Sequence, residues 1–131
     1  MKKVLVLCTG NSCRSIMAEA LINYYLDGVV AYSSGVNASL KVNEKAKKVL
    51  KQNGIWDERY HSKTLDKVLD MEFDLVVTVC DNAKENCPIF PKKTKNLHIS
   101  FKDPDGKDFK EFEKTYQNIK EKLLPKIKEV L

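Results

Sequence analysis

Two short apolar runs stand out in the alternation of hydrophobic and polar positions along the chain. Residues 4–7 (VLVL) and 74–79 (DLVVTV) are too short for a core helix and are rich in β-branched side chains. This pattern predicts two buried β-strands. Two weaker runs, residues 29–33 and 97–100, predict two further strands.

Apolar residues at helical spacing separate these strands. The spacing predicts three helices, over residues 12–26, 41–52 and 64–71. A long terminal helix is predicted to begin near Asp108, because Asp108 and Glu111 have the spacing of a capping box, and Pro125 is expected to kink or interrupt that helix. Strands that alternate with helices favour an α/β fold. The length of 131 residues suits one domain, so residues 1–131 are predicted to form a single domain.

The first predicted strand leads into a small polar loop that contains a cysteine. Gly10 follows Cys8 and permits a tight turn, and the residues after Ser15 have a helical pattern. Successive backbone N–H groups between a strand end and a helix N-terminus suit a phosphate-like tetrahedral anion, and their field favours the nucleophilic thiolate form of a cysteine. The residues predicted to bind the oxyanion are Thr9, Gly10, Asn11, Ser12, Cys13 and Arg14.

Arg14 strengthens this interpretation. The chain contains 21 Lys and only two Arg, and one of the two lies six residues after Cys8. A guanidinium group binds two oxygens of an oxyanion, where a Lys would supply only a point charge. Ser15 is placed to donate to the Cys8 sulfur. The alternative is that Cys8 is a buried structural thiol and Arg14 a solvated residue of the first helical turn, which leaves the polar loop unexplained.

Another pair of cysteines follows the second strong strand. Cys80 stands at the carboxyl end of residues 74–79, so we expect it at the same edge of a parallel sheet as Cys8. A polar insert of six residues separates Cys80 from Cys87. A regular helix from one cysteine to the other would place their Cα atoms about 10.5 Å apart, beyond the reach of a disulfide. Pairing would require the segment to unwind and would act as a conformational switch. The residues alone leave open that the two cysteines are unrelated, and a zinc site is a weaker alternative.

Composition narrows the classes of function. No stretch has the pattern of a signal peptide or the length of a membrane span, so we expect a cytoplasmic protein whose thiols have catalytic or redox roles. The net charge of +5 comes from scattered Lys, which argues against nucleic-acid binding. We expect a monomer without a metal or another cofactor.

The segment CTGNSCRS followed by IMAEA resembles the signature of the low-molecular-weight protein tyrosine phosphatase superfamily. This resemblance implies a three-layer α/β/α domain with a four-stranded parallel sheet, with Cys8 as nucleophile and Arg14 as oxyanion clamp. Pro104 fixes the backbone of a loop that resembles the family's Asp-Pro loop, which implies that Asp103 is the general acid. Asp105 is the less favoured candidate for that role.

The segment DLVVTVCDNAKENCP is similar to the thioredoxin-coupled arsenate reductases of the same superfamily. For that branch the resemblance implies that Cys80 attacks the Cys8 sulfur, that Cys87 then attacks Cys80, and that thioredoxin reopens the Cys80–Cys87 disulfide. Cys13 is not a relay position in that branch and is interpreted as a packed structural thiol. The ligand would be arsenate or a phosphate-like oxyanion.

Two other functions are also compatible with the sequence. A phosphatase would hydrolyse a Cys8-phosphate with water and would need no further thiol, and an oxyanion sensor would bind without chemistry. Residues 61–64 (HSKT) stand where reductases of the family place small polar residues that bind a monovalent cation, so potassium dependence is open. His61 itself is interpreted as a structural residue of a loop.

Overall fold

The computed structural model describes residues 1–131, and its four β-strands form one parallel sheet in the order β2-β1-β3-β4. The strands are β1 (Lys2–Cys8), β2 (Val29–Gly35), β3 (Leu75–Thr78) and β4 (Lys95–His98). The central strands β1, from Val4 onward, and β3 are buried along their length. Burial on both faces explains why these two strands are continuous apolar runs in the sequence.

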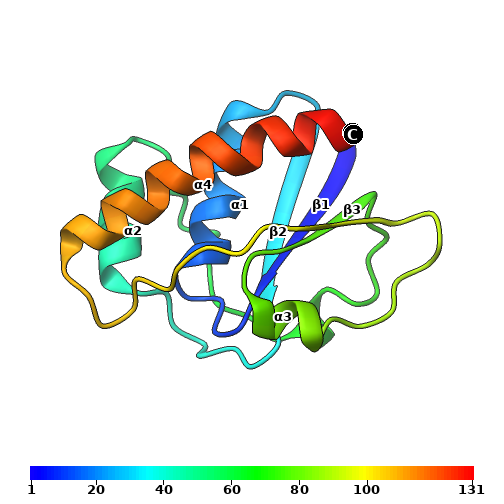
Figure 1. Cartoon of the computed structure of the whole chain (residues 1–131), viewed down its shortest axis with the longest axis horizontal. Helices are drawn as coiled ribbons and strands as arrows, with labels where there is room; N and C mark the ends of the chain where they lie inside the picture. The colour runs from blue at the N-terminus through cyan, green and yellow to red at the C-terminus, as the bar shows by residue number, and fades with distance from the viewer.

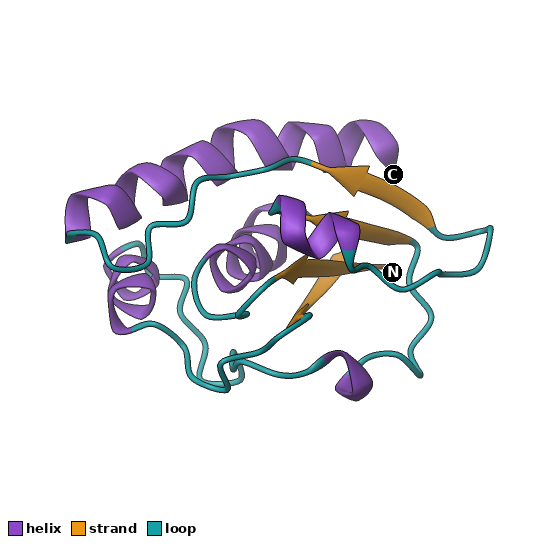
Figure 2. Cartoon of the chain, turned by 60° about the horizontal axis from the view of Figure 1, so that its bottom comes forward, coloured by secondary structure: helices purple, strands orange, loops and turns teal.

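Helices cover the sheet on both faces (Figure 1). The helical elements are α1 (Arg14–Tyr25), α2 (Glu44–Gln52), the 3₁₀ turn η1 (Leu65–Lys67), α3 (Asp81–Glu85) and α4 (Phe109–Val130). Helix α1 lies against β1 and β2, and α4 packs on α1, with α2 beside both. Figure 2 shows α4 on one side of the strands and η1 on the other. The predicted three-layer α/β/α architecture with a four-stranded parallel sheet is confirmed.

The layer opposite α1 is thin. The loop after η1 places Phe73 against the Tyr32 ring of β2, with the ring centroids 6.0 Å apart. Helix α3 contacts β1 and β3. This layer contains no long helix, and the prediction of a helix over residues 64–71 is wrong beyond the single turn η1. Thr64 is held in extended conformation by a bridge to Gly35, and too little of the segment is buried to sustain a longer helix.

The predicted interruption at Pro125 is also wrong, because α4 continues to Val130 (Figure 1). Pro125 cannot donate to the carbonyl group of Glu121, but both residues are exposed and water can bind that carbonyl. Buried side chains on the opposite face, among them Leu123 and Ile127, hold the helix against the core.

The other element boundaries differ from the predictions by a few residues. Helix α2 begins at Glu44 because the Asn43 side chain caps it, accepting bonds from the N–H groups of Lys45 and Ala46 at 2.8 and 3.4 Å. Helix α4 begins after Asp108, whose carboxylate accepts from the Glu111 N–H group as the capping-box spacing predicts.

Candidate active site

The loop between β1 and α1 surrounds the Cys8 thiol. The Asn11 N–H group donates to Cys8 Sγ at 3.2 Å, and Ser15 Oγ lies 3.0 Å from the same sulfur atom, the contact predicted from the sequence. Asn11 has a φ of 51°, in the left-handed region, so the chain turns tightly at this point. The sulfur is thus held at the strand end by two polar contacts on one side.

The carbonyl groups of the loop are bound by the segment that follows β2. The carbonyls of residues 8, 9, 10 and 12 accept from the backbone N–H groups of residues 36, 37, 39 and 43, at 2.9 to 3.1 Å. The N–H groups of residues 9, 10, 12 and 13 have no acceptor within the chain. The loop therefore presents a set of free backbone donors, as a site for a tetrahedral oxyanion requires.

Gly35 permits this close approach of the two segments. A Cβ atom at this position would lie 2.5 Å from the carbonyl oxygen of Thr9, well inside van der Waals contact. Any other residue at the end of β2 would displace the loop that holds Cys8.

The Asn11 side chain fixes the loop from behind. Its amide nitrogen donates to Ser15 Oγ at 2.7 Å and to Ser33 Oγ at 2.9 Å, and its amide oxygen accepts from the Lys63 N–H group at 2.8 Å. Asn11 is fully buried, so these bonds satisfy a group that would otherwise destabilise the fold. Sequence reasoning assigned Asn11 a backbone role and missed this side-chain role.

Arg14 lies at the first turn of α1 and contacts the Asp-Pro loop. Its Nη1 atom donates to the carbonyl oxygen of Phe101 at 3.0 Å, and its Nη2 atom lies 3.4 Å from Asp103 Oδ2. Asp103 Oδ1 accepts from the Asp105 N–H group at 3.0 Å. Asp105 is turned away, because its carboxylate accepts from the Asn43 side chain at 3.1 Å. The structure thus brings Arg14 and Asp103 together beside the loop.

Cys80 lies at the carboxyl end of β3, as predicted. Its Sγ atom is 3.3 Å from Thr9 Oγ1, which belongs to the residue after Cys8, and it accepts from the Ala83 N–H group at 3.4 Å as the N-cap of α3. Cys87 lies beyond α3, where its half-buried Sγ atom contacts the carbonyl oxygen of Pro88 at 3.4 Å, and burial raises the pKa of this thiol. All four cysteines are free thiols.

The Cys13 side chain is buried within the loop. Burial is the main cause that raises its pKa to about 12. A thiol with this pKa is a poor nucleophile at neutral pH, in agreement with the interpretation of Cys13 as a structural residue.

A buried carboxyl group behind the loop was missed by sequence reasoning. Glu19 of α1 is 6% exposed and accepts a hydrogen bond from Ser33 Oγ, and burial raises its pKa to about 7. Lys63 donates from Nζ to the carbonyl oxygens of Ser33 and His61, at 2.8 and 3.1 Å, and burial lowers its pKa. The sequence carried no signal for this role, because an acidic residue within a helical pattern is usually exposed to solvent.

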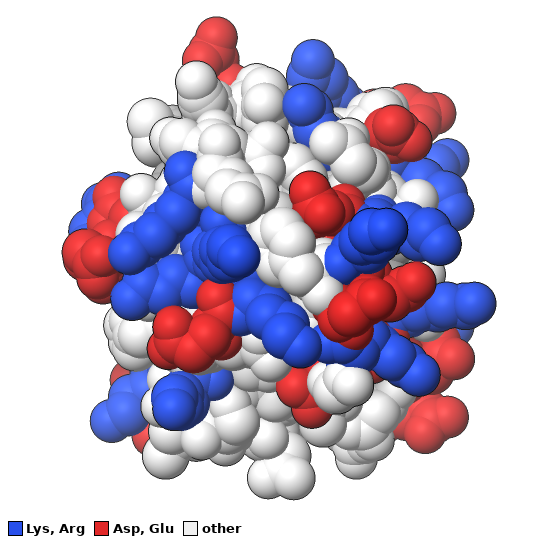
Figure 3. Space-filling model, turned by 90° about the vertical axis from the view of Figure 1, so that its left-hand side faces the viewer, with Lys and Arg blue, Asp and Glu red and all other residues white.

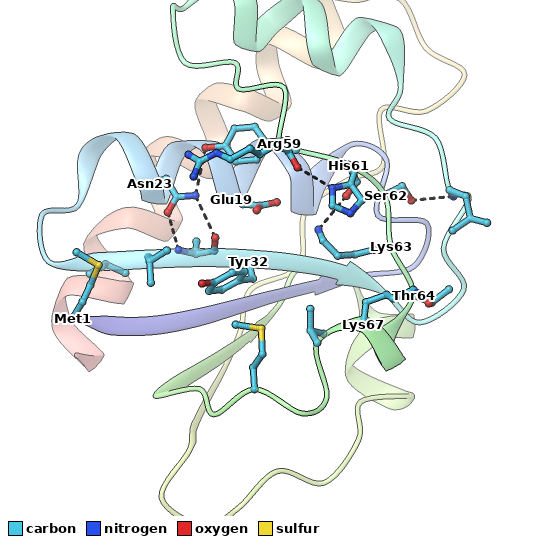
Figure 4. A pocket seen from close by; sticks show the side chains of 17 residues that line it. Met1, Glu19, Asn23, Tyr32, Arg59, His61, Ser62, Lys63, Thr64 and Lys67 are labelled. Atoms are coloured by element: carbon cyan, nitrogen blue, oxygen red, sulfur yellow. Dashed lines mark hydrogen bonds between the residues drawn. The ribbon is translucent and has the colours of Figure 1, made fainter.

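Glu19 and Lys63 line a cavity of about 700 Å³ beside β2 (Figure 4). Asn23 closes part of the strand edge, because its amide group bonds both the N–H and the carbonyl group of Ala31. The His61 ring contacts the carbonyl oxygen of Arg59 and lies in this loop rather than at the Cys8 thiol. The polar groups behind the loop that holds Cys8 therefore border a hollow on the outer edge of the sheet.

The lysines are dispersed over the surface. Figure 3 views the side formed by α2 and the beginning of α4, where Lys and Arg side chains alternate with Asp and Glu. Several of the lysines on these helices lie over aromatic rings, such as Lys48 over Phe109 at 4.6 Å from the ring centroid. None of the helices combines the length and the apolar character that a membrane span requires.

Comparison with known proteins agrees with this geometry. The family model of the low molecular weight phosphotyrosine protein phosphatases matches residues 3–130. The chain belongs to this family. Within it, the chain is 42% identical over 120 residues to arsenate reductase 2 of Staphylococcus haemolyticus, with 91% of each chain covered.

Solved structures of the family show the same fold. The chain superimposes on an arsenate reductase in the phosphate binding state with a TM-score of 0.81 and 26% identity, and on the low molecular weight protein tyrosine phosphatase of T. tengcongensis with a TM-score of 0.83 and 27% identity. Both alignments cover 100% of each chain. The resemblance found in the sequence is confirmed, and the family contains both reductases and phosphatases.

Proposed function

We propose that this enzyme reduces arsenate to arsenite by a relay of three thiols, Cys8, Cys80 and Cys87, and that thioredoxin regenerates it. The observation that carries this proposal is the position of Cys80, whose sulfur lies 3.3 Å from the hydroxyl group of Thr9, next to the loop cysteine. A phosphatase has no use for a second thiol at this place. The relatives named arsenate reductase support the same choice.

The first step is nucleophilic attack by the Cys8 thiolate on arsenic. Free N–H groups of the loop and the Arg14 guanidinium bind the oxygens, and Asp103 donates a proton so that one oxygen leaves as water. The product is a covalent bond between Cys8 Sγ and As(V). Asp103 is 53% exposed and can exchange its proton with water between turnovers.

The second step transfers two electrons to arsenic. Cys80 attacks Cys8 Sγ, the new disulfide forms, and the electron pair of the broken S–As bond remains on arsenic, which leaves as arsenite. Cys87 then attacks Cys80 Sγ, which releases the Cys8 thiolate and forms the Cys80–Cys87 disulfide. A dithiol such as reduced thioredoxin reopens this disulfide and is itself oxidised.

The second candidate is hydrolysis of phosphate monoesters through a Cys8-phosphate. It is favoured by the likeness to the T. tengcongensis phosphatase and by a loop that fits either tetrahedral anion. This activity needs Cys8, Arg14 and Asp103 but neither of the other two thiols.

The experiment follows NADPH oxidation with arsenate, thioredoxin and thioredoxin reductase, for wild type, Cys80→Ser and Cys87→Ser. We expect arsenate-dependent turnover to be lost in both variants. Hydrolysis of an aryl phosphate by the same preparations is the matched control and should be retained, because it does not use these thiols. Absence of turnover in wild type, with rapid ester hydrolysis in all three proteins, would reject the reductase function in favour of the phosphatase.

A further inference from the structure

Helix α3 separates the two thiols that must pair in the last step of the proposed relay. It has five residues, Asp81–Glu85, far fewer than a helix needs to be stable by itself. Its side-chain contacts with the rest of the protein therefore decide whether it stays folded. Some of these contacts must break before Cys87 can reach Cys80.

The first turn of α3 is tied down at three successive residues. Cys80 Sγ caps the helix by accepting from the Ala83 N–H group, Asp81 Oδ1 lies 3.0 Å from His98 Nε2, and Asn82 donates to Thr9 Oγ1 at 3.0 Å. The second turn has no such contact outside the helix, because the Asn86 side chain bonds only to Asn82. The N-terminal end of α3 is thus the fixed end.

The His98 ring connects this end of α3 to the sheet. His98 is the last residue of β4, and its Nδ1 atom lies 2.7 Å from Thr78 Oγ1 and 3.1 Å from the Thr78 carbonyl oxygen. Thr78 is buried at the end of β3, which makes it a rigid anchor. A carboxylate oxygen can only accept a hydrogen bond, so the contact with Asp81 is made by an Nε2–H donor of the ring.

Disulfide formation at Cys80 changes the contacts that hold the first turn of α3. When the Cys80 sulfur bonds to Cys8, it loses its proton and becomes a weaker acceptor for the Ala83 N–H group and for Thr9 Oγ1. The reaction therefore weakens the cap of α3 and the contact between Cys80 and Thr9, whereas the bonds of Asp81 to His98 and of Asn82 to Thr9 do not involve the sulfur.

We propose that His98 is a positioning residue that clamps α3 to the sheet and limits the rate at which Cys87 closes on Cys80. The clamp keeps the thiols of the resting enzyme apart until Cys80 has reacted. The role of this clamp in turnover rests on the proposed relay. The closure of the two thiols itself can be measured without arsenate.

The test measures disulfide closure directly. The Cys8→Ser protein, with Cys80 and Cys87 reduced, is treated with diamide, which oxidises two thiols to a disulfide and is reduced to the hydrazine. Differential alkylation and mass spectrometry give the rate of Cys80–Cys87 formation. We expect His98→Ala to close faster by about threefold to tenfold, the change that follows from losing one hydrogen bond of ordinary strength, because the Asp81 side chain is exposed to solvent.

Further variants separate the clamp from a general structural effect. Asp81→Ala should accelerate closure to a similar extent, and the double variant should add little, because both changes break one contact. His61→Ala, which removes the only other histidine, is the matched control and should close at the rate of the parent protein. In the Cys8-containing background, His98→Ala should leave aryl phosphate hydrolysis unchanged.

Unchanged or slower closure in a folded His98→Ala protein, with a near-UV circular dichroism spectrum like that of the parent, would overturn the clamp. Additive effects of the two single variants would overturn it as well. Neither result depends on arsenate turnover. A phosphatase that lacks the reductase activity would still give a measurable closure rate, so failure of the clamp and failure of the proposed function are distinguishable.

Discussion

The buried carboxyl group of Glu19 predicts a specific dependence of stability on pH. Burial raises its pKa from 4.5 to about 7, because the charged form loses hydration that one hydroxyl donor and the Lys63 ammonium do not replace. One pKa unit corresponds to about 1.4 kcal/mol, so the difference amounts to roughly 3 kcal/mol of unfolding free energy.

The sign follows from where the proton is bound. Below pH 4.5, Glu19 is protonated in the folded and in the unfolded chain and contributes nothing to the pH dependence. Between pH 4.5 and about 7 the unfolded chain releases the proton while the folded protein keeps it, so stability falls as pH rises. Above about pH 7 the loss is complete. Glu19→Gln keeps an acceptor for Ser33 and removes the titration.

The assay is urea unfolding of the reduced protein at pH 5 and pH 8, followed by the fluorescence of Trp56, the single tryptophan. The stability of Glu19→Gln minus that of wild type should increase by about 2 to 3 kcal/mol between the two pH values, because a small part of the loss has already occurred at pH 5. Glu113→Gln, at an exposed position of α4, is the control and should give a difference near zero at both. A Glu19→Gln difference that stays constant with pH would refute the reasoning.

Two further predictions concern the candidate active site. Gly35→Ala should lower kcat for aryl phosphate at least about tenfold while the protein remains folded, because the added Cβ would displace the Thr9 carbonyl and with it the loop donors. Steady-state kinetics measure kcat, and urea unfolding checks that the variant is folded. A folded variant with the kcat of wild type would contradict this prediction. Asp103→Asn should slow hydrolysis of a phenyl phosphate by about 10² to 10⁴ fold and should slow an ester of an acidic phenol much less, since that leaving group needs no proton. Equal losses for the two esters would contradict the role of Asp103 as the acid.

The parts of the fold that sequence reasoning identified best are those where one constraint dominates. Burial on both faces made β1 and β3 continuous apolar runs, and the strand, glycine and helix around Cys8 indicated an anion loop without any structure. Residues 64–71 and Pro125 were mispredicted because tertiary context outweighs local propensity. A bridge to Gly35 holds Thr64 extended, and core contacts keep α4 intact.

The support behind the loop could not be predicted, because its partners are distant in the chain. Asn11, Ser33 and Lys63 meet only when β2 and the loop after α2 lie side by side. In the sequence, a polar residue at any one of these positions looks like a common surface residue and does not indicate that the three side chains meet. Glu19 in particular reads as a solvated helix residue until its burial is known, and no spacing rule connects it with Ser33, fourteen residues later.

In the proposed relay, the Cys8 thiol must be held in place, whereas the Cys87 thiol must move. Cys8 must stay fixed, and the bonds from residues 36 to 43, the close approach at Gly35 and the Asn11 side chain hold its loop to the sheet. Cys87 must travel, and it follows a five-residue helix that is anchored only at its first turn. Cys80 lies where the strand ends and this helix begins, so a disulfide that moves from Cys8 to Cys87 through Cys80 passes from a loop held by many bonds to a short helix held at one end.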